Sequence, residues 1–334
     1  MAAEREPDGD DDVDGADEAT ASPSVRRLFG ELRAAVGSRP TAELVAVAVP
    51  IPALLVGLAL VPGSEAWRLS LAADGVLESR WTLWTAFASS FVHTSTTHLL
   101  DNVVNYWLLV AVAYPLSVIA GWRRRFLYAT LAFLAVVPLA SAWVTLAVLG
   151  ELTNAPAAGF SDVNSALLGY LVVVWFVALG SEGRSGSDVG HSRADRRNAT
   201  PPAPVGVDPR WSVVVVFASL SLVFLAPSGV DYFPPVPAAG GLFAITAAAV
   251  GIGLYRAAGR PRVAGLNLAP ARELLYVTGA SVVVAGVIGS LVVVPFGSNV
   301  YAHLVGYAFG SLVALLGVVV DGNRTTSAPA GRSR

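Results

Sequence analysis

Long apolar runs recur along most of the chain and alternate with short polar segments. Because a helix needs roughly 17–25 predominantly apolar residues to cross a bilayer, we interpret these runs as membrane-spanning helices. The pattern predicts eight spans, at residues 44–61, 98–119, 126–149, 163–179, 211–225, 238–254, 274–294 and 300–320. The predicted fold class is therefore an all-α polytopic membrane protein.

Composition favours a membrane protein over a soluble one. Hydrophobic residues make up 54% of the 334 residues and charged residues 14%, whereas soluble domains carry about 25% charged residues. The chain contains no cysteine, which excludes disulfides and thiolate metal ligands. Functional groups are therefore to be sought among the few polar residues inside the apolar runs.

The basic residues, all of them arginine, indicate the orientation of the spans. If eight spans alternate in direction, the arginine clusters that flank them fall on one side, and only Arg68 and Arg80 fall on the other. Positive charge collects on the cytoplasmic side of membrane proteins. We therefore expect a multi-pass protein of the cell (plasma) membrane with both termini in the cytoplasm.

The segments outside the spans divide the rest of the chain. Residues 1–40 are acidic and are predicted to be a largely disordered cytoplasmic segment, with a short surface helix near residues 25–36. Residues 41–322 form the predicted membrane domain, which includes a polar cytoplasmic loop at 181–210, and residues 323–334 form a cytoplasmic tail. The tryptophan-containing segment 63–92 is expected to lie at the outer membrane interface. The acidic start and the lack of lysine suit a high-salt cytoplasm, such as that of a halophilic archaeon.

Three polar features stand at the beginnings of predicted spans on the same, outer side. The second span starts with His98 and Asn102, the fourth with Ser161, and the eighth with His303. Ionisable groups inside a bilayer are costly and usually functional. Three helices therefore deliver polar side chains to one depth of the membrane.

Each feature also has a purely structural interpretation. His98, Asn102 and Asn105 share a helical stripe that could join helices by hydrogen bonds, and His93 is expected to hold the preceding loop by hydrogen bonds. A Gly159-x-Ser161 pattern is also common at membrane helix interfaces. Together, however, the residues supply a serine nucleophile, a histidine base and donors for an oxyanion, which are the parts of an acyl-transfer site. A metal site fits less well, because no carboxylate is grouped with His98 and His303.

The motifs resemble those of the rhomboid family of intramembrane serine proteases. The resemblance covers roughly residues 41–322, and its motifs concentrate at 81–107, 159–170 and 301–310. The matching patterns, in chain order, are His93-x4-His98-x3-Asn102, Gly159-x-Ser161, and Ala302-His303-x2-Gly306-x3-Gly310.

The resemblance implies a rhomboid-like bundle and a role for each matching residue. Ser161 would be the nucleophile and His303 the general base, without a third acid. His98, Asn102 and the Ser161 backbone N–H would stabilise the oxyanion. Supporting positions would be His93, Gly159, Asp162, Gly306 and Gly310. The implied partners are transmembrane protein substrates and the lipid bilayer, with no cofactor, no metal and no nucleic acid.

Several positions depart from the family pattern. Asp162 stands where glycine usually follows the serine, and a carboxylate there would act on His303 or repel a developing oxyanion. Ser165 stands where an aromatic residue is common. Three spans instead of one separate the serine helix from the histidine helix, which implies a six-helix core with two inserted helices.

These departures leave two alternatives to a protease. One is a catalytically weak or inactive rhomboid-like protein that binds transmembrane segments without cutting them. The other is a small transporter, which would carry ionisable residues at mid-membrane, whereas these residues lie near the ends of spans.

Overall fold

The regular structure of the described chain is almost entirely helical. The computed structural model describes residues 41–150, 152–153, 155–189, 207–226, 232–261, 268–293 and 298–326. The helices in these ranges are α2 (Thr41–Ala48), α3 (Pro50–Ala59), α4 (Arg80–Ala88), α5 (Thr96–Ile119), α6 (Arg123–Leu149), α7 (Ser161–Val189), α8 (Trp211–Leu225), α9 (Pro237–Ala258), α10 (Pro270–Val287) and α11 (Val300–Thr326). Two short 3₁₀ turns (Ser64–Trp67 and Ser89–Phe91) and one π turn (Ile288–Val292) accompany them.

Seven helical segments are long and apolar enough to cross a membrane, and α2 and α3 together count as one of them. The predicted fifth span, α8, has the predicted bounds but only 15 residues. The prediction of a rhomboid-like helical bundle is confirmed, with seven full-length candidates and one short apolar helix among the described residues. A bilayer crossing would leave α8 short of the usual length.

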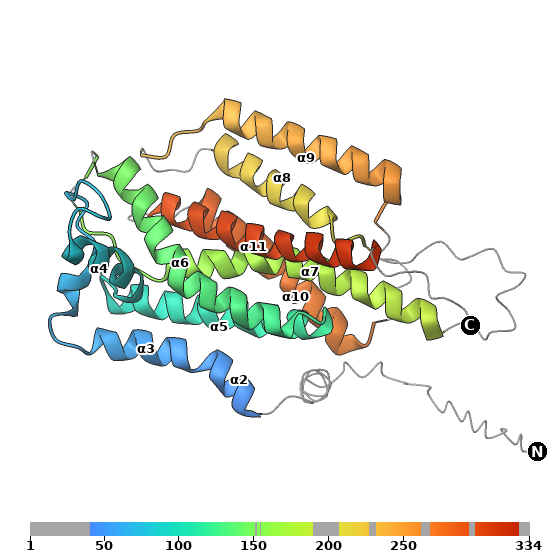
Figure 1. Ribbon diagram of the computed structural model, residues 1–334, viewed down its shortest axis with the longest axis horizontal. Helices are drawn as coiled ribbons and strands as arrows, with labels where there is room; N and C mark the ends of the chain where they lie inside the picture. The colour runs from blue at the N-terminus through green and yellow to red at the C-terminus, as the bar shows by residue number, and fades with distance from the viewer. Residues whose placement is uncertain are drawn as a thin grey trace, which may run out of the picture.

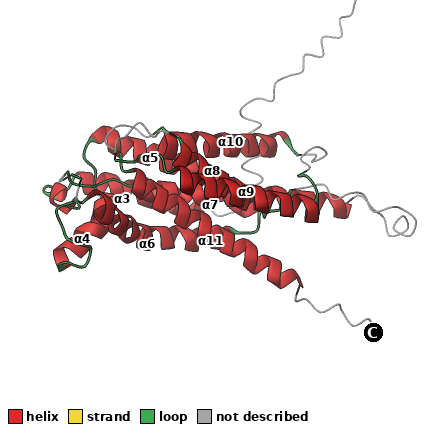
Figure 2. Ribbon diagram, turned by 90° about the horizontal axis from the view of Figure 1, so that it is seen from above, coloured by secondary structure: helices red, strands yellow, loops and turns green. Residues whose placement is uncertain are grey.

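Helix α7 is the centre of the bundle. Its most apolar window is 89% buried, whereas no other candidate span exceeds 56%. It packs against α5, α6, α8, α10 and α11, which surround it in both views (Figures 1 and 2). A helix that is apolar on all sides suits such a central position, where it contacts other helices on every side.

The closest packing joins α7 to α11. A Cβ atom on Gly306 would overlap the carbonyl oxygen of Asp162, and one on Gly310 would overlap that of Ala166. On the facing helix, a Cβ on Gly169 would overlap the carbonyl oxygen of Tyr307. Small residues allow membrane helices to approach at backbone distance. Gly306 and Gly310 therefore allow α11 to lie directly against the backbone of α7.

Helices α8 and α9 form a pair at the side of the bundle (Figure 1). They pack mainly on one another, and α9 lies on the outside of the bundle (Figure 1). Helix α10 instead packs against α7 and α5. Among the three helices between α7 and α11, α10 therefore belongs to the core.

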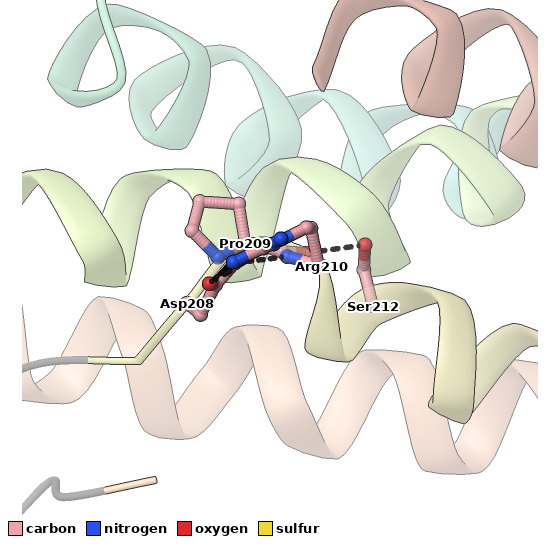
Figure 3. A network of polar contacts seen from close by, with 4 residues as sticks. All are labelled: Asp208, Pro209, Arg210 and Ser212. Carbon is pink, nitrogen blue, oxygen red and sulfur yellow. Dashed lines mark hydrogen bonds and ion pairs between the residues drawn. The ribbon is translucent and has the colours of Figure 1, made fainter. Parts of the chain in front are cut away.

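The start of α8 is fastened beside the far end of α7. Asp208 forms an ion pair with Arg210, and the Ser212 hydroxyl donates to the Pro209 carbonyl at 2.7 Å (Figure 3). A Cβ on Gly180 of α7 would lie 3.2 Å from the Pro209 ring. Because α7 continues to Val189, the polar loop predicted at 181–210 begins later than expected.

The segment 63–92 does not cross the bundle. It contains the nine-residue helix α4 and packs on the end of α6 through a separate small core. That core consists of Leu69, Leu71, Val76, Ala86, Ala142, Leu146 and Leu149. The side chains of Trp81 and Trp84 remain exposed, as suits an element at a membrane interface.

Ion pairs join the helices at the opposite end. Glu43 pairs with Arg123, Asp321 with Arg125, and Glu182 with Arg272. The predicted N-terminal segment 1–40, the central part of the 181–210 loop and most of the tail lie outside the described residues. The domain boundaries therefore stay predictions.

Candidate active site

The helices that carry the predicted site begin at one end of the bundle. The first turns of α5, α7 and α11 contain His98, Ser161 and His303, respectively, and all three helices start on the left in Figure 1. The expectation that these residues share one depth therefore agrees with the arrangement of the helices.

The loop that precedes Ser161 is held from the side by the interfacial segment. Leu69 and Ala157 exchange two backbone hydrogen bonds of 2.9 and 3.0 Å. Two residues later, the Gly159 N–H donates to the Ser89 carbonyl at 2.9 Å. The chain therefore enters α7 in a fixed direction, which orients the first turn and its serine.

Gly159 makes room for His98. Its φ of +127° belongs to a region that side chains rarely adopt, and a Cβ there would lie 2.6 Å from His98 Nε2. The His98 ring thus lies against the backbone two residues before Ser161. Its other nitrogen, Nδ1, is 3.3 Å from the Thr94 hydroxyl.

Asp162 is bound away from the proposed chemistry. Its carboxylate accepts hydrogen bonds from Ser90 at 2.8 Å and Ser141 at 2.6 Å, and from the Val163 N–H at 2.7 Å. The side chain is buried at the positive end of the α7 helix dipole, which favours an anion. The concern that this carboxylate would act on His303 is not supported, because Asp162 anchors α7 to α6 and to the Ser89–Phe91 turn.

Asn102 is oriented by a neighbour that the sequence reasoning missed. Asn164, three residues after Ser161, donates to both the carbonyl oxygen and Oδ1 of Asn102 at 3.0 and 3.2 Å. The Asn102 amide nitrogen donates to the His98 carbonyl at 3.0 Å. Since an amide carries two N–H donors, one remains for a ligand. Asn164 could have been found as a polar residue one turn from the serine on a helix that is otherwise apolar.

The predicted polar stripe on α5 is only partly correct. His98 and Asn102 face the bundle, whereas Asn105 is exposed. Asn105 therefore takes no part in the site.

His93 was expected to hold its loop by hydrogen bonds, but its side chain makes none among the described residues. Both ring nitrogens are buried without a partner in the described part of the chain, and its carbonyl accepts from Arg68 at 3.1 Å. The ring packs edge-on against His98, with 5.2 Å between centroids. Burial, followed by the charge of His98, lowers the pKa of His93 to about 4. His93 is therefore a neutral packing partner of His98 at neutral pH.

His303 is buried and held by the end of α10. Only 6% of its surface is exposed, and its Nδ1 lies 2.7 Å from the Ser290 carbonyl oxygen. A carbonyl can only accept, so Nδ1 carries the proton and Nε2 keeps its lone pair. No motif of the sequence pointed to Ser290, since a backbone acceptor leaves no mark on residue type.

Ser161 is the first residue of α7 and is partly exposed. Its hydroxyl makes no hydrogen bond within the described ranges, and none joins it to His303. Catalytic hydrogen bonds are often long or absent until substrate binds.

In the described part of the chain, no cluster of metal ligands is found, and a cavity lies away from the site. Among the described residues, no three His, Asp or Glu side chains gather in a way that could hold a metal ion. A cavity of about 500 Å³ lies at the opposite end, lined by Ala120, Gly121, Trp122, Arg123, Arg124, Arg125 and Asp321. It touches none of the predicted site residues.

Comparison with known families agrees with the motifs. Residues 80–181 match the family model described as the Rhomboid domain, a stretch that runs from α4 into α7 and includes His98, Asn102 and Ser161 but not His303. No curated protein and no solved structure matches the chain. The chain thus contains a segment that is similar to the Rhomboid domain.

Proposed function

We propose that this protein is an intramembrane serine protease that hydrolyses peptide bonds in or near transmembrane segments of other proteins. The proposal depends on one observation. Ser161, at the start of α7, has a hydroxyl without a hydrogen bond to any other described residue, and His303, at the start of α11, has its Nδ1 bonded to a backbone carbonyl. That bond leaves Nε2 as the basic atom, which is what activation of a serine requires. The backbone packing at Gly306 fixes the histidine helix against the serine helix.

In the proposed reaction, Ser161 Oγ attacks the scissile carbonyl and His303 Nε2 takes its proton. The proton then passes to the leaving amine, and water hydrolyses the acyl-enzyme by the same route. The oxyanion would receive hydrogen bonds from His98, from the second N–H of Asn102 and from the Ser161 backbone N–H. Support for this assignment comes from the contact of His98 with Gly159 and from the two bonds that Asn164 makes to Asn102.

We infer that the site faces the outer side of a plasma membrane and that both termini are cytoplasmic. The ion-paired arginines Arg123, Arg125 and Arg272 lie at the end opposite Ser161, which supports this orientation through the preference of arginine for the cytoplasmic side. Substrates would then be cut near the outer face, where water reaches the serine.

The test is cleavage of a membrane-spanning reporter by purified protein in liposomes. Ser161→Ala is expected to abolish cleavage, while Ser281→Ala, on an exposed face of α10, is the matched control and should cleave normally. Equal cleavage by the Ser161→Ala protein would reject the proposal.

A binder that holds transmembrane segments without cutting them is the second candidate. It is favoured by the absence of a hydrogen bond between Ser161 and His303. Covalent labelling by a fluorophosphonate distinguishes the two functions, because only an activated serine reacts. Labelling that disappears in Ser161→Ala supports the protease, and its absence in the native protein supports the binder.

A further inference from the structure

A π turn at the end of α10 presents one backbone carbonyl to His303. The Val293 N–H bonds to the carbonyl of Ile288, five residues earlier, at 2.7 Å. Ser290 lies within this turn, and His303 Nδ1 is 2.7 Å from its carbonyl oxygen. Single π turns of this kind are frequent at functional sites.

The side chain of Ser290 takes a different role from its carbonyl. Its hydroxyl donates back to the Gly286 carbonyl at 2.5 Å, so it is occupied within α10. Among the described residues, no carboxylate bonds to the His303 ring, and the carboxylate of Asp162 is bound by Ser90 and Ser141. The backbone oxygen is therefore the acceptor that orients His303.

The position of this carbonyl depends on close packing between α10 and α7. A Cβ on Gly286 would lie 2.8 Å from the Leu168 side chain of α7, one turn before Ser290. A Cβ on Gly253, an exposed helical glycine of α9, would meet nothing within 4 Å. Gly286 and Gly253 are thus two helical glycines, one at a contact and one in open space.

We propose that the Ser290 carbonyl is a positioning group for His303. It would take the place of the aspartate in a Ser-His-Asp catalytic triad. It holds His303 in the Nδ1–H tautomer and aims Nε2 at the serine, and its dipole stabilises the imidazolium that forms when Ser161 gives up its proton. The expected effect on catalysis rests on the proposed protease function. The tautomer of His303 does not, and it can be measured in a protein without activity.

The first experiment is NMR of the full-length protein labelled with ¹⁵N-histidine in bicelles at pH 8. The chain has four histidines, so His303 can be assigned by His303→Gln or by elimination with His93→Gln, His98→Gln and His191→Gln. We expect a protonated Nδ1 and an unprotonated Nε2 on His303. A protonated Nε2 would overturn the proposal, whether or not the protein proves to be a protease.

The second experiment compares Gly286→Val with Gly253→Val. Moving the carbonyl by about 1 Å should lower kcat on the order of 10²-fold in Gly286→Val, with KM unchanged and with a mixed tautomer signal. Gly253→Val should stay within about twofold of the native kcat, as expected of an exposed position without contacts. A Gly286→Val protein that folds and keeps both the native tautomer and the native kcat would overturn the proposal. If no variant and no native protein cleaves the reporter, the tautomer signals alone decide.

Discussion

Gly306 of α11 packs directly on the carbonyl of Asp162, so that the two helices touch backbone to backbone one turn from the proposed site. Gly306→Val is therefore expected to force the helices apart and to destabilise the protein by about 1–3 kcal/mol or more. Reporter cleavage should fall with it, since His303 moves with α11. Thermal unfolding and cleavage rates check both effects. Ala308→Val, on an exposed face of the same helix, is the control and should change neither.

Gly159 has both a positive φ and a close contact with His98, and a comparison with Gly63 distinguishes the effects of the two. Gly159→Ala would place a methyl group against the His98 ring, and the expected loss is about 10²–10³ in kcat, as for removal of one oxyanion donor. Gly63 also has a positive φ, +81°, but has open space around it. Gly63→Ala therefore measures strain alone and should keep native kcat. Equal losses in both variants would contradict a specific role for the contact with His98.

Asn164 should matter to catalysis only through Asn102. Asn164→Leu removes both hydrogen bonds that orient Asn102, so kcat should fall by less than the loss of about 10²–10³ expected for Asn102→Ala. The double variant should be no slower than Asn102→Ala, which would appear as a coupling energy of about 0.5–3 kcal/mol in a double-mutant cycle. Additive effects would show that the two residues act independently. The exposed Asn105→Leu serves as the control.

Restoring the residue usual in the family should damage this protein. Asp162→Gly leaves the buried Ser90 hydroxyl without its acceptor and leaves Ser141 only the Pro138 carbonyl, at 3.1 Å. We therefore expect a loss of about 1–3 kcal/mol in unfolding free energy and no gain in kcat. Asp74→Gly, at an exposed position, is the matched control. A faster and equally stable Asp162→Gly protein would show that the carboxylate hinders the reaction.

His93 predicts a pH dependence of stability. Its pKa is lowered to about 4 in the folded protein, first by burial and then by His98, whereas the ordinary value is 6.5. The unfolded chain therefore binds the proton more tightly, so the stability present above pH 6.5 is lost as the pH falls towards 4. Allowing for partial exposure to solvent, His93→Gln should recover about 1–3 kcal/mol of that loss. The check is the difference in melting temperature between the two proteins at pH 7.5 and pH 4.5. An unchanged difference across this range would contradict the shift.

The residue patterns were sufficient to predict the helices. They also predicted that α5, α7 and α11 begin at the same end of the bundle (Figure 1). Apolar runs of membrane length and the regular alternation of arginine clusters are one-dimensional signals, and they predicted α8 to the residue. Helix ends were less predictable, because α7 continues past its apolar part to Val189. The division of the three intervening helices into one core helix and a pair at the side of the bundle depends on packing alone, which no residue type records.

The site was predictable where chemistry needs a particular side chain and unpredictable where the backbone supplies the contact. Ser161, His98 and His303 carry the resemblance by residue type. The Ser290 carbonyl could not be recognised, since any residue has one. Asp162 was misjudged because adjacency in sequence was taken as adjacency to the chemistry, whereas its side chain leaves the helix towards Ser90 and Ser141.

The central position of α7 has a consequence for synthesis of the protein. Its neighbours come from both earlier and later parts of the chain, since α5 and α6 precede it and α10 and α11 follow it. A ribosome therefore delivers the helix with Ser161 into the bilayer before the helix with His303. Under the proposed function, the serine would lack its general base during this interval, so the nascent protein would not attack its neighbours at the insertion site before α11 has docked.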